Sequence, residues 1–264
     1  MTILDKIIKE KYKEVALQKT LVPVSELKKK IDFDRTPVSL KESLTKSGSS
    51  GIIAEFKRKS PSKGMINGGV RVEDVTKGYA SAGVAGLSIL TDRQFFGGSL
   101  IDLVATRQVN KIPILRKDFM IDEYQVIEAK SMGADAILLI AAAIDLPLIK
   151  RLASCAKSLG LEILFEIHAR EELDKIVDEV DMVGVNNRNL KDFKVDLQHS
   201  ITLSKQVPDK FVKVSESGID NVDTIKMLKQ EGFQGFLIGE NFMKTENPGE
   251  ACREFIKELA VDTP

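Results

Sequence analysis

The chain has 264 residues, of which 43% are hydrophobic and 30% are charged, a composition that supplies a sizeable core and excludes a disordered chain. Lys and Arg total 39, as do Asp and Glu, so the overall charge gives no reason to expect a nucleic acid or an anionic membrane as partner. Charges interrupt residues 1–13, where a signal peptide needs an apolar run, and no apolar stretch reaches the roughly 18 residues of a membrane span. We therefore expect a soluble cytoplasmic protein.

Residues 1–50 contain two helical patterns. The first places apolar residues at helical spacing from Ile3 to Val15, and the second lies near Val38–Lys46. The Ser- and Gly-containing loop that ends at Gly51 is too short to separate two domains. We expect this segment to pack as a helical extension on the mouth of a single domain that spans residues 1–264.

From residue 51 onward, short β-rich runs alternate with amphipathic stretches. The predicted strands are Gly51–Lys57, Gly86–Thr91, Ile112–Lys117, Ala136–Ile140, Leu161–Ile167, Met182–Asn186, Phe211–Ser215 and Gly235–Ile238. Predicted helices between them include Val72–Ala82, Asp122–Met132, Leu146–Leu159 and Val222–Gln230. Eight such units in a chain of this length favour an α/β fold closed into a (β/α)8 TIM barrel over a doubly wound open sheet.

Charged residues gather where three of these strands end, and in a barrel the chemistry lies at the carboxyl ends of the strands. The two-residue period of a strand places Glu55 and Lys57 together on the inward face of the first strand and turns Phe56 outward. By the same parity, Lys117 and Glu166 point inward. Such an ammonium suits a general acid, a Schiff-base nucleophile or an anion clamp. Carboxylates and ammonium groups at one mouth suit proton transfer, because burial and neighbouring charges can make one group an acid and another a base.

The loops after the later strands carry polar and small residues. Asn186 is placed to orient a substrate hydroxyl and Arg188 to bind a carboxylate, although Asn is also common in turns. The loops that follow the seventh and eighth strands predict a phosphate site, because small residues allow backbone N–H groups to surround an anion. The expected ligands of this phosphate are Ser60, Ser217, Gly218 and Gly239.

Two further predictions concern residues outside this group. His168 and His199 receive no catalytic role, because their positions after a strand and within an amphipathic helix are typical of caps and surfaces. Glu162 and Lys213 are expected to form a buried ion pair inside the barrel, on strands that share interior layers. The two cysteines are far apart and give neither a disulfide framework nor the spacing of metal ligands.

Six blocks resemble the indole-3-glycerol phosphate synthase family, in order and over nearly the whole chain. They are Ile53-Ala-Glu-Phe-Lys-Arg-Lys-Ser-Pro-Ser62, Leu87-Ser-Ile-Leu-Thr91 with Phe96-Gly-Gly-Ser99, Ile114-Leu-Arg-Lys-Asp-Phe119, Gly184-Val-Asn-Asn-Arg188, Ser215-Glu-Ser-Gly218 and Leu237-Ile-Gly239. The first block is specific to the family, whereas the last two are shared by other phosphate-binding barrels. The glycine-rich loop at residues 64–71 does not align with the family, so it receives no role.

The resemblance implies a carboxy-lyase of tryptophan biosynthesis. It implies that the enzyme closes 1-(2-carboxyphenylamino)-1-deoxyribulose 5-phosphate to indole-3-glycerol phosphate, with loss of CO2 and water and with no metal or cofactor. The substrate is thus a small phosphorylated molecule. We expect a monomer, with other tryptophan-pathway enzymes as candidate partners.

The resemblance also implies a role for each site residue. Lys117 is the general acid that protonates the ribulose carbonyl, and Glu166 is the base for dehydration, assisted by Glu55. Lys57 holds the carboxylate that leaves. The implied substrate contacts are Asn186, Arg188 and Glu216 in a polar shell, Phe96 and Phe119 beside the aromatic ring, and Ser60, Gly218 and Gly239 on the phosphate.

Two other functions remain open at this point. In a barrel aldolase, Lys117 would form a Schiff base, which borohydride would trap. In a barrel that only binds phosphorylated ligands, Glu55, Lys117 and Glu166 would have no reason to converge.

Overall fold

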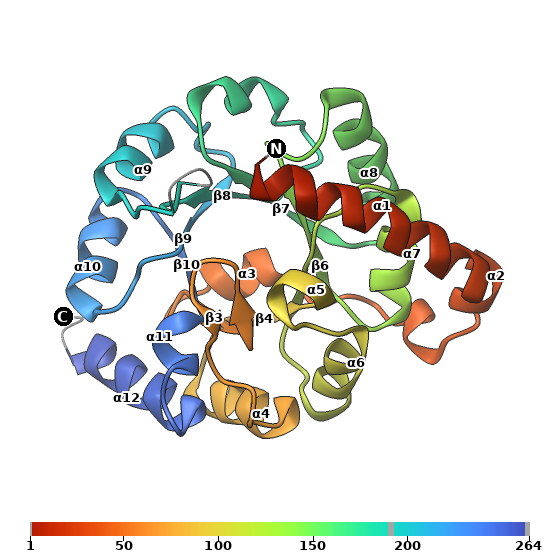
Figure 1. Cartoon of the computed structure of the whole chain (residues 1–264). Helices are drawn as coiled ribbons and strands as arrows, with labels where there is room; N and C mark the ends of the chain where they lie inside the picture. The colour runs from red at the N-terminus through yellow and green to blue at the C-terminus, as the bar shows by residue number, and fades with distance from the viewer. Residues whose placement is uncertain (1, 190–192, 262–264) are drawn as a thin grey trace.

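The fold is a closed barrel of eight parallel strands surrounded by helices, as a computed structural model of residues 2–189 and 193–261 shows (Figure 1). In chain order the barrel strands are β1 (Ile52–Phe56), β4 (Gly86–Leu90), β5 (Ile114–Lys117), β6 (Ala136–Ile140), β7 (Glu162–Ile167), β8 (Met182–Asn186), β9 (Val212–Glu216) and β10 (Gly235–Ile238), and β10 pairs with β1 to close the barrel. The predicted TIM barrel is confirmed, with each strand close to its predicted bounds.

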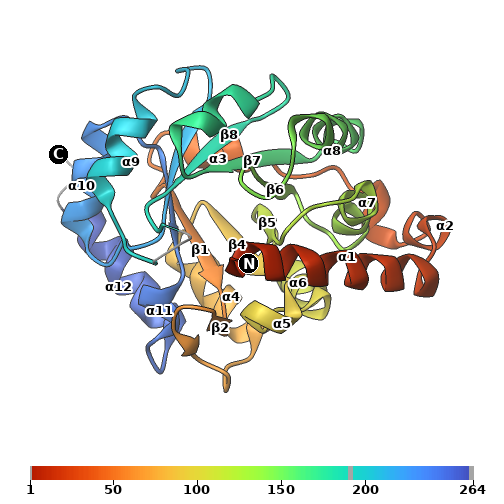
Figure 2. The ribbon, with the colours of Figure 1, turned by 45° about the horizontal axis from the view of Figure 1, so that its top comes forward.

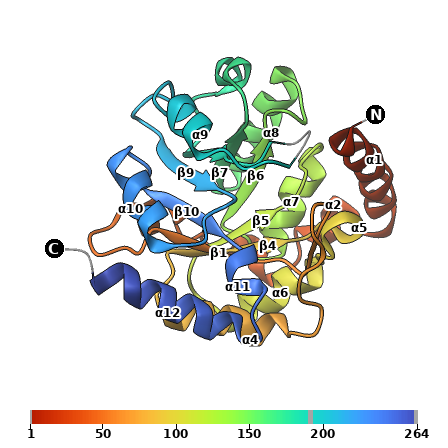
Figure 3. The same ribbon diagram turned by 60° about the vertical axis from the view of Figure 1, so that its left-hand side comes forward.

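The outer layer consists of helices that follow the strands. They are α4 (Val72–Ala82), α5 (Arg93–Phe96), α6 (Leu100–Val109), α7 (Glu123–Ser131), α8 (Leu146–Ser158), η2 (Arg170–Lys175), α9 (Leu197–Ser204), α10 (Val222–Gln230), α11 (Glu240–Met243) and α12 (Pro248–Val261). Figure 3 shows α12 lying alongside α4, and the ring of Phe242 joins them at 5.8 Å from Tyr79 and 5.6 Å from Phe255. Among the described helices, none combines the length and apolar character needed to cross a membrane.

Strand parity separates two apolar cores. On β1, Ile53 belongs to the core inside the barrel, whereas Ile52, Ala54 and Phe56 belong to the core between strands and helices. Alternate side chains of a strand point to opposite faces, so the same parity directs Glu55 into the barrel. This alternation fixes which strand-end residues reach the mouth.

The first fifty residues lie at both ends of the barrel. They form α1 (Ile3–Leu21), α2 (Val24–Leu27), η1 (Ile31–Asp34) and α3 (Leu40–Thr45). Figure 2 shows α1 starting near the strands and running outward to α2. In contrast, Leu40 and Leu44 of α3 pack on the interior core at the amino ends of the strands.

A short antiparallel hairpin after β1 is absent from the sequence prediction. It pairs β2 (Lys59–Ser60) with β3 (Gly64–Met65), and Gly64 adopts a left-handed conformation with φ of 68°. The Asn67 side chain donates two hydrogen bonds of 3.1 Å, to the carbonyl oxygens of Met243 and Thr245. The glycine-rich loop is therefore docked on the end of α11 and the residues that follow it.

The predicted ion pair of Glu162 with Lys213 is wrong. Glu162 accepts hydrogen bonds from the backbone N–H groups of Leu40 and Lys41 at 2.7 and 2.9 Å, and Lys213 pairs with Asp209 at 3.1 Å. On β9 it is Val212 and Val214 that join the interior core, so Lys213 has the outward parity. The prediction took Ser217 as an inward residue of β9, which gives Lys213, four residues earlier, the same parity. In the structure the inward residue is Glu216, so the inward parity belongs to Val212 and Val214.

Candidate active site

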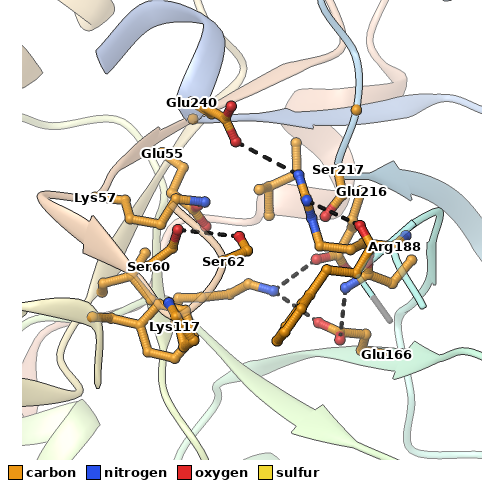
Figure 4. Close-up of a pocket in the computed structure, with 18 of the residues that line it drawn as sticks. Glu55, Lys57, Ser60, Ser62, Lys117, Glu166, Arg188, Glu216, Ser217 and Glu240 are labelled. Atoms are coloured by element: carbon orange, nitrogen blue, oxygen red, sulfur yellow. Dashed lines mark hydrogen bonds and ion pairs between the residues drawn. The ribbon is translucent and has the colours of Figure 1, made fainter. Parts of the chain in front are cut away.

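One pocket at the carboxyl ends of the strands collects the predicted site residues (Figure 4). Every predicted catalytic and substrate-binding residue lines it, and they come from β1, β5, β7, β8 and β9 and from the loops that follow the strands. Apolar residues of α1 also line the pocket, namely Ile3, Leu4 and Ile7. The charged residues Glu55, Lys57, Lys117, Glu166 and Glu216 form one part of the pocket, which we call the charged floor. The apolar wall consists of Ile3, Leu4, Ile7, Phe96 and Phe119.

Lys117 lies at the centre of the charged floor. Its Nζ is 2.8 Å from Oε2 of Glu166 and 2.7 Å from Oε2 of Glu216. Burial alone would lower the pKa of Lys117, but the charges of Glu166, Glu216 and Glu55 hold that pKa above its usual value. The residue is thus a proton-carrying ammonium, positioned between two acceptors.

Glu216 is close to the backbone of the neighbouring strand. A Cβ atom at Gly184 would lie 2.1 Å from Oε1 of Glu216, so a larger residue at position 184 would displace this carboxylate from its place beside Lys117. Burial, reinforced by the charge of Glu166, raises the pKa of Glu216 to about 7, although Lys117 opposes the shift. Two acidic groups beside one ammonium therefore differ in proton affinity, which suits a site that transfers protons near neutral pH.

Glu166 is the carboxylate that remains ionised. Its Oε1 accepts a hydrogen bond of 3.0 Å from Nδ2 of Asn186 and lies 3.1 Å from Nε2 of His168. Burial would raise the pKa of Glu166, but Lys117 and His168 hold it well below its usual value. The contact with His168 is one that the sequence reading missed. The parity that points Glu166 inward also applies to His168, two residues later, and therefore predicts that His168 faces inward.

Glu55 and Lys57 form the second charged pair of the floor. Lys57 Nζ lies 2.8 Å from Oε1 of Glu55, which is buried, while Lys57 is 19% exposed and borders the opening. The Ser88 hydroxyl donates to Glu55 at 3.3 Å, and a Cβ at Gly239 would approach Glu55 Oε1 to 2.8 Å. The predicted inward pairing on β1 is therefore what the structure contains.

The loops after β9 and β10, which the sequence predicts to bind phosphate, line the pocket. Ser217 and Gly218 have consecutive positive φ values of 71° and 72°, a left-handed turn that is costly for serine. Asn187 Nδ2 supports this turn by donating to the Ser217 carbonyl oxygen at 2.7 Å. Ser60 is buried, and its hydroxyl accepts a 3.2 Å hydrogen bond from the N–H of Lys63. The Arg188 guanidinium reaches Glu240 at 3.5 Å, at the rim.

Two aromatic rings form the apolar wall with α1. The ring centroids of Phe96 and Phe119 are 5.9 Å apart, at an interplanar angle of 38°. Beside them, Lys11 of α1 is 1% exposed and contacts two buried carboxylates. Sequence reasoning missed Lys11, although it interrupts the buried stripe of Ile7 and Val15 at four-residue spacing.

Comparisons with known proteins show which proteins this chain is similar to. A family model described as indole-3-glycerol phosphate synthase matches residues 4–255. The indole-3-glycerol phosphate synthase of Bacteroides thetaiotaomicron is 50% identical over 257 residues, covering 97% of this chain and 98% of that protein. The indole-3-glycerol phosphate synthase of Chromobacterium violaceum is 46% identical over 77% of each chain. Thiamine phosphate pyrophosphorylase of Pyrococcus furiosus shares the fold, with a TM-score of 0.58, 16% identity, and coverage of 84% of this chain and 99% of that one.

Proposed function

Because the chain belongs to the indole-3-glycerol phosphate synthase family, carboxy-lyases of tryptophan biosynthesis, we propose a specific division of labour among its pocket residues in the closure of 1-(2-carboxyphenylamino)-1-deoxyribulose 5-phosphate to indole-3-glycerol phosphate. The observation that carries the proposal is the Lys117 ammonium, held between Glu166 and Glu216 and close to an apolar wall. An aromatic ring against that wall would bring the adjacent ribulose carbonyl to the charged floor.

Lys117 acts first, as the general acid. As the ring carbon attacks the ribulose carbonyl carbon, the carbonyl oxygen gains a proton from Lys117 Nζ and becomes a hydroxyl group. Lys57 binds the carboxylate until the bond to CO2 breaks and its electron pair returns to the ring. A cation suits this role because it is near the opening and already pairs with a carboxylate, that of Glu55.

Glu166 acts next, as the base of the dehydration. Glu166, with Glu55 assisting, takes a proton from the intermediate, and this proton replaces the one with which the new hydroxyl group leaves as water. Asn186 orients Glu166, whose low pKa keeps it unprotonated before this step. Arg188 and Glu216 complete the polar shell around the substrate.

The remaining contacts hold the two ends of the substrate. Phe96 and Phe119 flank its aromatic ring, and the phosphate lies against the loops that contain Gly218 and Gly239. Ser217 and Ser60 contribute hydroxyl groups to the same end. The turn at Ser217 and Gly218 supports this assignment, because successive backbone N–H groups in a turn can point toward an anion.

The direct test is product formation by the purified chain. Since the chain contains no Trp, the indole fluorescence of the product can be followed against a weak protein background. We expect equal amounts of indole product and CO2, unchanged by a chelator. An active barrel that releases no CO2, or a chain that forms no indole product, would contradict the proposal.

A Schiff-base aldolase is the second candidate, and the electrostatics of Lys117 weigh against it. Imine formation requires a neutral amine, whereas neighbouring carboxylates keep Lys117 protonated. Borohydride treatment with substrate is expected to leave Lys117 unmodified. A pocket that only binds phosphate is also disfavoured, because Glu55, Lys117 and Glu166 line the same pocket.

The proposal includes the setting of the enzyme. Residues 1–264 act as one domain, in which the part of residues 1–50 that covers the mouth is α1. The chain works in the cytoplasm as a monomer on a small phosphorylated substrate. Gel filtration of the purified chain against mass standards tests the oligomeric state.

A further inference from the structure

Lys11 is a fully buried lysine on the helix that borders the pocket. Its side chain is 1% exposed, and Nζ lies 2.9 Å from Asp118, 3.1 Å from Asp92 and 2.8 Å from Glu14. Burial alone would lower the pKa of Lys11, but the charges of Asp118, Asp92 and Glu14 raise it above its usual value. A buried ammonium without its carboxylate partners is costly, so a movement of α1 that separated Lys11 from them would be unfavourable. These contacts therefore hold α1 in one position.

Asp118 connects Lys11 to the charged floor. It directly follows Lys117, and its Oδ1, which contacts Lys11, also accepts a 2.8 Å hydrogen bond from the N–H of Phe119. Its Oδ2 accepts from the Thr91 hydroxyl at 2.5 Å and from Arg116 at 3.2 Å. The backbone between Lys117 and Phe119 is therefore fixed by a carboxylate that Lys11 neutralises.

Asp92 connects Lys11 to the other aromatic ring. Its Oδ1 caps α5 by accepting from the N–H groups of Phe95 and Phe96, at 2.8 and 3.3 Å. Its Oδ2 is the atom that contacts Lys11. One ammonium thus links both strand-end segments that present Phe96 and Phe119 to the pocket.

The same helix face reaches the pocket directly. Ile7 is buried one turn before Lys11, and with Ile3 and Leu4 it lines the pocket opposite the charged floor. Farther along, the contacts of α1 with α7 include an exposed pair of Lys19 with Asp122 and a 2.9 Å hydrogen bond from Tyr124 to the Val22 carbonyl oxygen. Lys11 is the charged contact of α1 nearest the site.

We infer that Lys11 is a positioning residue for ring closure: it ties α1 to the ends of β4 and β5 and so fixes Phe96, Phe119 and Lys117 around the aromatic part of the substrate. The inference rests on the proposed function. It does not require Lys11 to touch the substrate. A displacement of about 1 Å in such groups can cost on the order of a hundredfold in rate.

The test compares Lys11→Met with variants that separate positioning from stability. Lys11→Met removes the charge and leaves Asp92 and Asp118 buried without it. Lys11→Met combined with Asp92→Asn removes one of these stranded charges, and Asn still caps α5. Lys19→Met, on the exposed part of α1, is the matched control, and Asp92→Asn alone is the reference against which the double variant is compared.

Wild type is assayed first, because an inactive wild type contradicts the proposed function rather than the role of Lys11. Activity is measured well below each unfolding midpoint. We expect Lys11→Met to raise KM and to lower kcat/KM by roughly 10- to 100-fold. In the double variant, the unfolding midpoint should recover while kcat/KM stays at least about tenfold below that of wild type, and Lys19→Met should stay within about threefold of wild type.

Two results would overturn the inference. Lys11→Met with kcat/KM within about twofold of wild type would show that the site does not need this contact. Recovery of both the midpoint and kcat/KM in the double variant would show that Lys11 only balances buried charge. If Lys11→Met does not fold, the double variant compared with Asp92→Asn gives the same decision.

Discussion

At the scale of single residues, the pocket controls where protons reside. Lys117 Nζ is within hydrogen-bonding distance of both Glu166 and Glu216, yet the pKa values of these two carboxyl groups shift in opposite directions because their other neighbours differ. Glu166 has His168 and Asn186 beside Oε1, whereas Oε1 of Glu216 has no hydrogen-bond partner among the described residues. Identical carboxyl groups can therefore play different roles.

Removal of the Lys117 ammonium should stop the first proton transfer. Lys117→Ala is expected to lower kcat by about 10²–10⁴-fold, the range typical of general acid catalysis, and to leave the fold intact. Steady-state kinetics and circular dichroism check the two parts. Lys213→Ala is the matched control, because Lys213 has outward parity on β9 and pairs with exposed Asp209. Near-normal turnover of Lys117→Ala would disprove the mechanism.

His168 should make stability depend on pH. Burial would lower the pKa of His168, but its contact with Glu166 raises that pKa above 6.5 in the folded chain. Glu172 and Glu216 also favour the protonated form. A raised folded-state pKa contributes stability that is fully present below the unfolded value and is lost as pH rises through the folded value.

The measurement is urea unfolding of wild type and His168→Asn from about pH 6 to about pH 9. The wild type should be more stable at the acid end, and the difference should shrink toward the alkaline end. A difference that stays constant with pH would contradict the assigned charge of His168.

At the scale of elements, α3 shows how a strand residue can hold a helix. Glu162 at the start of β7 accepts hydrogen bonds from the Ser39 hydroxyl at 2.5 Å and from the first backbone N–H groups of α3. These donors have no partner within the helix, and a negative charge is favourable at its amino end. The contact fixes α3 beneath the barrel.

Glu162→Gln should therefore weaken the fold without affecting catalysis. Loss of the charge at this cap is expected to lower the free energy of unfolding by about 1–2 kcal/mol. Urea titration measures the loss, and kcat/KM should stay unchanged because Glu162 lies at the end of β7 opposite the pocket. Glu42→Gln, exposed in the first turn of α3, should change stability by less than about 0.5 kcal/mol. Equal effects of the two variants would argue against the cap.

At the scale of the whole molecule, the two ends of the barrel have separate tasks. The carboxyl ends hold the pocket, while the amino ends hold a buried charge cluster around Asp135, directly before β6. Asp135 is fully buried and lies 2.8 Å from both Arg35 and Arg107. It also accepts from the N–H groups of Val38 and Ile114, at 2.7 and 2.8 Å. This cluster joins the N-terminal segment to β5 and β6, far along the chain.

Asp135→Ala should be a pure stability variant. Removal of one partner from a buried ion cluster is expected to cost about 3–5 kcal/mol, because Arg107 keeps its charge with no carboxylate beside it. Thermal unfolding measures the loss. At temperatures where the variant is folded, kcat/KM should stay within about twofold of wild type, and a large decrease would mean that the two ends are coupled.

The sequence by itself determined the barrel and most of the pocket. Eight β-rich runs and their two-residue period place Glu55, Lys117 and Glu166 inward, and both signals are local, because parity along a strand requires no knowledge of its partners. The same local rule places His168, two residues after Glu166, on the inward face, although histidine after a strand is also typical of caps and surfaces.

Tertiary structure alone decided how distant segments meet. Nothing near Lys11 in the sequence indicates that its ammonium faces Asp92 and Asp118, which lie more than 80 residues farther along the chain. The wrong pairing of Glu162 with Lys213 has a different cause: the two-residue period divides the residues of β9 between two faces, and the core inside the barrel contains Val212 and Val214, so Lys213 lies on the outward face. Periodicity reports which face a residue occupies, whereas partners across space depend on closure, register and the path of α1.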